Sequence, residues 1–255
     1  MMAEVTLTPI AYIQSCYPDR FGIPRQAGLV KSAYADIVFD ATEDNKLALR
    51  GIDEFSHLWV LFIFHGQTYG NFKPLVRPPR LGGNKSVGVY APRSPNRPNA
   101  IGMSAVKLLA VIASKRQLRL QVQGGDFLDG TPVVDIKPYI PYADAIETAQ
   151  GAWAVEQENV LPVSWSDGAQ AVLTEDVEPE SLRHLIEETL GQDPRPGYER
   201  GKDARLGQRW NMQISHYRVF WTVKNGVAEV VKLEWADRTS TREGCSTDGV
   251  VTDVN

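Results

Sequence analysis

The first 142 residues of this chain contain no segment with a long helical hydrophobic period. They consist of short alternating or apolar segments, separated by connections that are rich in Pro and Gly. The segments predicted as strands are 6–13, 34–39, 57–65, 101–112, 117–123 and 133–137. Short strands with long connections are typical of an all-β domain, and of a barrel in particular. We therefore expect residues 1–145 to form a β-barrel.

The strongest of these segments, HLWVLFIFH at 57–65, predicts a strand in the middle of the sheet. Side chains alternate between the two faces of a strand, and both faces are apolar here between the terminal histidines. Such a strand is expected to be covered on both sides. His65 lies at its end, beside a basic loop, where a histidine is either a site residue or a structural one.

The rest of the chain predicts a small α+β subdomain at 171–238, after a linker at 146–170 and before a flexible tail at 239–255. Four apolar residues share one helical face within 179–190, so a helix is expected there. Two alternating segments, 212–223 and 227–235, flank Asn225-Gly226, which is a strong hairpin signal. The expected fold class is mainly β, with an N-terminal barrel and a C-terminal α+β subdomain.

Several functional classes lack their sequence signatures. Neither a G-x-x-x-x-G-K-[ST] loop nor a G-x-G-x-x-G turn is present, so phosphate-loop and Rossmann cofactor domains are not supported. The four histidines lack zinc-ligand spacing, and the two cysteines, Cys16 and Cys245, form no disulfide framework. No apolar run has membrane-spanning length, and no signal peptide is evident. We expect a cytoplasmic protein without a metal or a membrane partner.

Charge is distributed very unevenly along the chain. The net charge is −4, yet residues 55–125 contain ten Lys or Arg and no Asp or Glu, which leaves 17 cations and 31 acids elsewhere. The loop-rich centre of this region, 77–103, contains the cations Arg77, Arg80, Lys85, Arg93 and Arg97. A basic face on an acidic protein is typical of polyanion binding. The alternative is a solvated basic loop that lies beside acidic residues after folding.

Four groups of polar residues fall at the ends of predicted strands. They are Pro24-Arg25-Gln26, His65-Gly66-Gln67, Arg93 to Asn99, and Leu128 to Thr131. Such a set can surround a small zwitterionic cofactor, with Arg for a carboxylate and backbone or Asp groups for an ammonium or a hydroxyl. The sequence order therefore predicts a pocket between these loops.

Three separated motifs resemble the TrmO family, which is also called the TsaA-like or YaeB-like family. They are GIDEFSHLWVLFIFH, GVYAPRSPNRPNAIGMSAVKL and LDGTPVVDIKPYIPYADA, in this order within the first 145 residues. The segment QDPRPGYERG, before the closing hairpin, is similar to the C-terminal part of bacterial members. The sequence departs from the family pattern at Gly66, which separates the motif histidine from Gln67.

This resemblance implies an S-adenosylmethionine-dependent tRNA methyltransferase with a barrel outside the Rossmann class. The implied reaction is methylation of N6 in threonylcarbamoyladenosine, next to the anticodon and chiefly in threonine tRNA. The implied partners are the anticodon stem-loop and a second subunit, with the cofactor near the interface of a homodimer. The implied cofactor-binding residues are Pro24, Arg25, Gln26, His65, Gly66, Arg93, Met103, Leu128, Asp129, Gly130 and Thr131.

The implied reaction removes a proton from a carbamoylated nitrogen, so it needs a base. His65 is one candidate, Asp129 or Asp135 orients it or acts instead, and the substrate's own carboxylate is a third candidate. Arg93 or Arg97 is expected to bind that carboxylate. The residues expected to contact RNA are Arg77, Arg80, Lys85, Arg97, Asn99 and Lys137. Two other functions remain open, namely a non-catalytic RNA-binding barrel and a small-molecule methyltransferase on the same scaffold.

Overall fold

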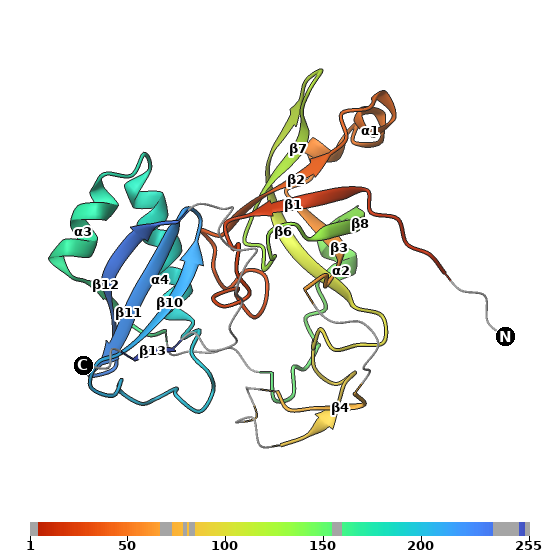
Figure 1. Ribbon diagram of the computed structural model, residues 1–255. Coiled ribbons are helices and arrows are strands. Elements are labelled where there is room, and N and C mark those ends of the chain that lie inside the picture. The colour runs from red at the N-terminus through yellow and green to blue at the C-terminus, as the bar shows by residue number, and fades with distance from the viewer. Residues whose placement is uncertain are drawn as a thin grey trace.

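The computed structural model describes residues 5–66, 73–78, 81, 85–154, 160–236 and 250–252 of the chain. Within these residues it contains a closed six-stranded barrel, a five-stranded sheet and a two-stranded sheet. The barrel lies beside the C-terminal sheet, which carries α3 and α4 (Figure 1). The expected mainly β fold with an N-terminal barrel is confirmed.

The barrel strands follow the order β1–β2–β7–β6–β3–β8, and all neighbouring pairs are antiparallel. Their bounds are β1 (Ala11–Ser15), β2 (Tyr34–Phe39), β3 (His57–Ile63), β6 (Ile101–Ala113), β7 (Leu118–Gln123) and β8 (Pro132–Pro138). The connections contain α1 (Glu43–Ala48), η1 (Ile52–Glu54), β4 (Leu75–Val76), β5 (Val87–Gly88) and α2 (Pro141–Asp144). Thr42 caps the N-terminus of α1, and its side chain accepts a hydrogen bond from Asn45 N at 3.2 Å.

Strand β3 is paired on both edges, with β6 and with β8, but only one of its faces is fully buried. Leu58, Val60 and Phe62 are buried in the barrel core, whereas the alternate residues from Trp59 to Ile63 are only half-buried. The prediction that both faces are covered therefore holds for the inner face and only in part for the outer face. Trp59 on the outer face donates its indole N–H to Asp144 at 2.9 Å, so α2 covers part of this face.

Gly102 in β6 is the position where the barrel tolerates an added side chain least. A Cβ there would lie 2.3 Å from the ring of Phe62, which packs edge-to-face on Phe64 and Phe127. We expect Gly102→Ala to lower the free energy of unfolding by about 1–3 kcal/mol, because the ring stack must shift. Chemical denaturation measures this loss, and Gly88→Ala, with nothing within 4 Å of the added Cβ, is the matched control. Equal stability of the two variants would contradict the packing.

The C-terminal sheet has the order β13–β10–β11–β12–β9. Its strands are β9 (Val163–Trp165), β10 (Gln208–Ile214), β11 (Tyr217–Lys224), β12 (Val227–Trp235) and β13 (Val250–Thr252), and its helices are α3 (Asp167–Thr174) and α4 (Pro179–Gly191). The predicted helix and the hairpin at Asn225-Gly226 are both present, and these two residues have the positive φ values of 52° and 71° that such a turn needs. The single strand predicted over 212–223 is wrong, because a turn at Ser215-His216 divides it into β10 and β11.

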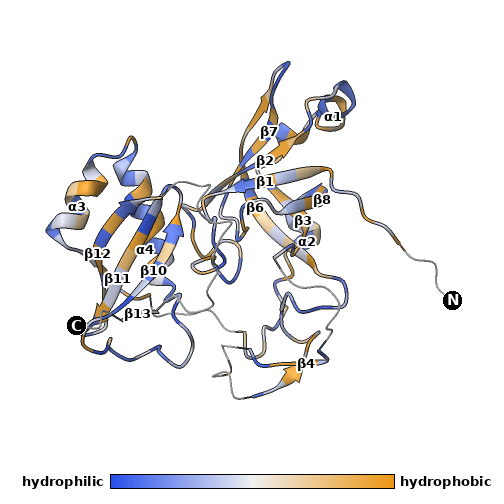
Figure 2. Ribbon diagram, in the orientation of Figure 1, coloured by the Kyte–Doolittle hydropathy of each residue, from blue (hydrophilic) through white to orange (hydrophobic). Residues whose placement is uncertain are grey.

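Two further segments differ from the expected organisation. The predicted linker includes β9, which pairs in parallel with β12, and the N-terminal half of α3. The predicted tail includes β13, which pairs with β10. Hydrophobic stretches alternate with hydrophilic ones along the sheet and α3, as expected for elements with one buried face (Figure 2).

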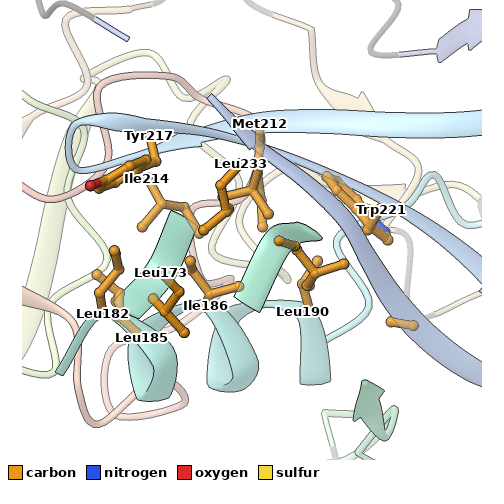
Figure 3. Close-up of a cluster of buried hydrophobic side chains, with 14 of the residues drawn as sticks. Leu173, Leu182, Leu185, Ile186, Leu190, Met212, Ile214, Tyr217, Trp221 and Leu233 are labelled. Atoms are coloured by element: carbon orange, nitrogen blue, oxygen red, sulfur yellow. The ribbon is translucent and has the colours of Figure 1, made fainter. Parts of the chain in front are cut away.

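Helix α4 packs its apolar side against the C-terminal sheet. Leu182, Leu185, Ile186 and Leu190 are all buried and point toward side chains of the sheet, including Met212, Ile214 and Leu233 (Figure 3). None of the helices in the described part of the chain is long and apolar enough to cross a membrane.

The connection from β1 to β2, residues 16–33, belongs to the C-terminal core as much as to the barrel. Cys16, Tyr17, Val30 and Ala33 are buried in the same hydrophobic cluster as α4 and the C-terminal sheet. The Tyr17 hydroxyl lies 2.9 Å from Thr189 Oγ1 in α4. The C-terminal part therefore supports the loop that contains the predicted Pro24-Arg25-Gln26 group.

Candidate cofactor-binding and active site

A cavity of about 520 Å³ lies where four segments distant in sequence meet, namely 20–26, 62–66, 90–104 and 126–131. This volume is typical of a pocket for a cofactor-sized molecule. Of the predicted cofactor residues, those that line it are Pro24, Arg25, Gln26, His65, Gly66, Arg93, Met103, Leu128 and Thr131. The four loop groups expected from sequence order thus each contribute to one cavity wall.

Arg93 and Gln26 join two of these loops. Arg93 Nη1 donates a hydrogen bond to Gln26 Oε1 at 2.7 Å, and Gln26 Nε2 donates to the Arg25 carbonyl at 2.5 Å. Arg93 is exposed and the hydrogen bond to Gln26 engages one of its five N–H donors, so the guanidinium can still bind an anion.

Arg97 folds the loop that carries Arg93. Its Nη1 donates to the Pro92 carbonyl at 2.9 Å, and its guanidinium carbon lies 5.6 Å from the centre of the Tyr90 ring. Both contacts lie within residues 90–97, so Arg97 fixes the shape of a loop that lines the cavity.

His65 follows the last residues of β3 and lies between Arg20 and the 128–131 turn. Its Nδ1 is 3.4 Å from Thr131 Oγ1, whose hydroxyl proton is donated to the Leu128 carbonyl at 2.7 Å. His65 is exposed overall, but desolvation of the covered part of its ring and then the nearby Arg20 cation lower its pKa, against a smaller opposing effect of the Asp129 backbone hydrogen bond and charge. The imidazole is therefore held neutral near pH 7, which is the form that accepts a proton.

A side chain at position 66 would be crowded. A Cβ at this position would lie 3.1 Å from Arg20 Nε and 3.3 Å from a Leu128 methyl group. The absence of a side chain lets Arg20 and Leu128 approach behind His65. The neighbour Gln67 lies outside the described residues.

Two predicted carboxylates do not line the cavity. Asp129 Oδ1 accepts a hydrogen bond from Ser15 N at 2.8 Å, so this carboxylate is directed to the backbone of β1. Asp135 forms an ion pair with Lys137 at 2.8 Å on β8 and is partly exposed. Asp129 and Gly130 are not among the lining residues, but their turn lies next to His65. The Asp129 backbone hydrogen-bonds to His65, and a Cβ built on Gly130, which has φ 75°, would lie 3.9 Å from His65 Nε2. Neither carboxyl group is positioned to act on a ligand in the cavity.

Apart from Arg97, which lines the cavity, the residues predicted to contact RNA fall into three groups. Arg77, Lys85 and Asn99 are exposed, as phosphate-binding groups must be. Lys137 is ion-paired with Asp135, and Arg80 lies outside the described residues. One cation of the acid-free region is compensated after folding, because Arg119 pairs with Asp36 of β2 at 3.0 Å.

Several wall residues were not predicted from the sequence. They are Arg20, Phe62, Phe64, Ser104 and Asp126, among others. Phe62 and Phe64 occur in the strongest predicted strand, where an apolar side chain gives no indication that it faces a ligand. A signal for Asp126 did exist, because it is the first acidic residue after the acid-free region.

The wall chemistry fits S-adenosylmethionine. The cofactor combines a flat adenine ring, hydroxyl groups and an α-amino acid, and the wall combines phenylalanine rings, backbone groups, arginines and a carboxylate. No group of three or more His, Cys, Asp or Glu that could hold a metal ion occurs in the part of the chain that the structure describes.

A closed antiparallel barrel with such a cavity between its loops defines a cofactor-binding β-barrel outside the Rossmann class. Residues 12–145 match the tRNA-methyltransferase O N-terminal domain, and residues 158–236 match the TrmO C-terminal domain. The chain belongs to the TrmO family, as the sequence motifs predicted.

Relatives match over most of the chain. The tRNA (adenine(37)-N6)-methyltransferase of Escherichia coli is 40% identical over 235 residues, which cover 91% of this chain and 99% of the relative. RcsF of Pseudomonas aeruginosa, named for a proposed S-adenosylmethionine-dependent methyltransferase activity, is 40% identical over 85% of this chain and 91% of its own. The crystal structure of TrmO from Pseudomonas aeruginosa superposes with a TM-score of 0.72 at 32% identity, covering 91% of this chain and 99% of that one.

Proposed function

We propose that this protein transfers a methyl group from S-adenosylmethionine to N6 of threonylcarbamoyladenosine next to the anticodon, chiefly in threonine tRNA. The observation that carries the proposal is the match of both domains to a family whose Escherichia coli member is named tRNA (adenine(37)-N6)-methyltransferase. The cavity walls fall within the matched N-terminal region. The requirement for the threonylcarbamoyl group and the preference for threonine tRNA are proposed in addition to N6-methylation of tRNA.

The cavity residues have distinct roles in this proposal. Arg93, fixed by Gln26, binds the α-carboxylate of the cofactor. Apolar surface for the adenine ring comes from Phe62, Phe64 and Leu128. When bound, S-adenosylmethionine supplies a methyl group on a positively charged sulfur, which needs alignment with the acceptor nitrogen rather than activation. The 16–33 connection, supported by α4, keeps the Pro24-Arg25-Gln26 group in place.

His65 is the side chain that we assign to proton removal. A carbamoylated N6 nitrogen is a poor nucleophile and must lose its proton during or after attack. His65 is neutral near pH 7 because burial and Arg20 lower its pKa, and Thr131 contacts its ring. The substrate's own carboxylate is the alternative base, while Asp129 and Asp135 are disfavoured because neither lines the cavity.

The pH dependence of the rate separates these two bases. We expect the rate of wild-type methyl transfer to fall as the pH decreases through the pKa of His65, which lies below its usual value of about 6.5. His65→Gln should lower the rate by about 100-fold or more and remove this inflection. Single-turnover rates between pH 5 and 8 measure both effects, with circular dichroism at each pH as the folding control. An unchanged profile in His65→Gln would assign the proton to the substrate carboxylate.

Exposed cations of the acid-free region provide the proposed tRNA surface. Arg77 and Lys85 are exposed, as is the neutral Asn99, and Arg80 belongs to the same predicted group. Because phosphate contacts release counterions, tRNA affinity should decrease steeply with salt concentration. A tRNA substrate fits a cytoplasmic location, as does a sequence whose two cysteines form no disulfide framework.

The outer face of β3 and β6 is the surface that we propose for a homodimer. Ile101 and Met103 are 39% and 51% exposed there, beside half-buried Leu61 and Ile63. Met103 also lines the cavity, so a partner subunit on this face would cover one edge of the cofactor site. Analytical ultracentrifugation tests the dimer.

Calorimetric titration with S-adenosylmethionine tests the class of function. Saturable binding is expected, and its absence would favour a non-catalytic RNA-binding barrel. Transfer of the labelled methyl group to tRNA is expected at low salt. Transfer to small acceptors but not to tRNA would favour a small-molecule methyltransferase instead.

A further inference from the structure

The cavity wall contains a carboxylate that has no role in the scheme above. Among the described lining residues Asp126 is the only acid, and the same wall contains Arg20, Arg25, Arg93 and Arg97. A wall with this charge balance favours an anionic ligand everywhere except around Asp126. The position of Asp126 is therefore chemically distinct within the site.

The hydrogen bonds to Asp126 come from neutral groups. Ser104, buried in β6, donates its hydroxyl to Asp126 Oδ1 at 2.5 Å, and the Ala27 backbone N–H also hydrogen-bonds to the carboxylate. The described part of the chain contains no ion pair to Asp126. Arg93 acts on it electrostatically from a longer distance, and burial raises its pKa. A carboxylate has about four acceptor sites, so part of its capacity is left for a ligand.

A half-buried carboxylate without an ionic partner is costly unless a ligand compensates it. The proposed cofactor has two positive groups, a sulfonium and an α-ammonium. Only the ammonium donates hydrogen bonds. The Asp126 carboxylate, oriented by the Ser104 hydroxyl, provides oxygen atoms that accept them. Arg93, in the same wall, complements the α-carboxylate of such a zwitterion.

We infer that Asp126 binds the α-ammonium of the methionine portion of the cofactor, with Ser104 as the positioning residue that fixes its carboxylate. This inference rests on the proposed function, which supplies the cofactor. It makes Asp126 the residue that distinguishes an amino acid-bearing cofactor from analogues that lack the amine.

A purely structural role for Asp126 is the alternative that the test must exclude. Asp126 is hydrogen-bonded to Ala27, and Gly28 N donates to the Gly124 carbonyl at 2.8 Å, so the 124–126 segment holds the loop next to Pro24-Arg25-Gln26. If Asp126 only anchored this loop, its replacement would weaken every ligand of the cavity alike.

Two ligands that differ only in the amine separate these roles. S-Adenosylhomocysteine binds without turnover, and its des-amino analogue retains the adenine, ribose, thioether and carboxylate. Asp126→Asn should weaken S-adenosylhomocysteine by about 10- to 100-fold, the worth of a hydrogen bond between charged groups. The affinity for the des-amino analogue should change less than about twofold, measured in the same way by calorimetry.

The matched control is Asp40→Asn, an exposed carboxylate outside the cavity, which should bind both ligands as the wild type does. Equal weakening of both ligands in Asp126→Asn, or no weakening of either, would overturn the inference. The wild type gives an independent check if the variant does not fold. The wild type must bind the des-amino analogue about 10- to 100-fold more weakly than S-adenosylhomocysteine, and equal affinities for the two ligands would also overturn the inference. Absence of S-adenosylhomocysteine binding to the wild type would instead count against the proposed function.

Discussion

Arg93→Ala is expected to lower methyl transfer to tRNA by about 100-fold or more without unfolding the barrel. The guanidinium faces the cavity and holds Gln26 Oε1 at 2.7 Å, so its loss removes both an anion-binding group and the link between two loops. Charge-assisted hydrogen bonds contribute about 1.5–3 kcal/mol each, and two of them account for this factor. The side chain is exposed, so the melting temperature should change little. Initial rates with labelled S-adenosylmethionine and thermal melts measure the two quantities.

Two further variants sharpen this result. Arg50→Ala removes an exposed arginine outside the cavity and the acid-free region, and it should retain wild-type activity. Arg93→Lys keeps the charge but not the planar pair of donors, so an intermediate rate is expected. Full activity in Arg93→Ala would remove Arg93 from the site.

Arg195→Ala is expected to destabilise the C-terminal part by about 3–5 kcal/mol. Arg195 is 1% exposed and binds the Asp193 carboxylate through Nε and Nη2 at 2.7 and 2.8 Å. Its Nη1 donates to the Lys202 carbonyl, and its guanidinium lies 5.2 Å from the centre of the Trp210 ring. Truncation therefore leaves a buried carboxylate without its cation and releases the 193–202 loop. Denaturant unfolding, monitored by tryptophan fluorescence, measures the change.

A second substitution separates the contribution of the Arg195–Asp193 ion pair to stability from that of the packing of the Arg195 side chain. Arg195→Ala combined with Asp193→Asn should be less destabilised than Arg195→Ala alone, because no unpaired charge remains buried. Lys224→Ala, which removes an exposed cation at the end of β11, is the control and should change stability by less than about 0.5 kcal/mol. A loss in Arg195→Ala as small as in this control would contradict the buried ion pair.

Regular alternation and turn residues made most of the strands predictable. The hairpin at Asn225-Gly226 carries its turn signal in the sequence, because these residue types adopt positive φ at little cost. The turn at Ser215 was missed because Ser215 has φ 53° without being Gly or Asn. Its tertiary hydrogen bonds, from its N–H to the Cys16 carbonyl at 2.7 Å and from the Tyr34 hydroxyl to its Oγ at 3.0 Å, are not encoded locally. Closure of the barrel through two residue pairs of β1 and β8 is a long-range property that no local pattern contains.

The loops that surround the cavity were predictable from the sequence, but several of the individual side chains that line it were not. Arg93, His65 and the 24–26 group stand out because polar residues at strand ends have few structural roles. Whether a side chain points into the cavity depends on tertiary packing, which the sequence does not show. Asp129 was therefore predicted to be a site residue, whereas its carboxylate accepts a hydrogen bond from the backbone of β1. Ser104 and Asp126 contact each other across 22 residues of sequence, and nothing in either segment alone indicates that pair.

Mass spectrometry of the nucleosides from threonine tRNA tests the central claim most directly. The purified protein is incubated with S-adenosylmethionine and two tRNA preparations, one with and one without the threonylcarbamoyl group on the adenosine next to the anticodon. We predict a mass increase of one methyl group on that nucleoside, in the modified tRNA and not in the unmodified one. An unchanged nucleoside in an assay where the cofactor is bound, or a methyl group on a different nucleoside, would contradict the account.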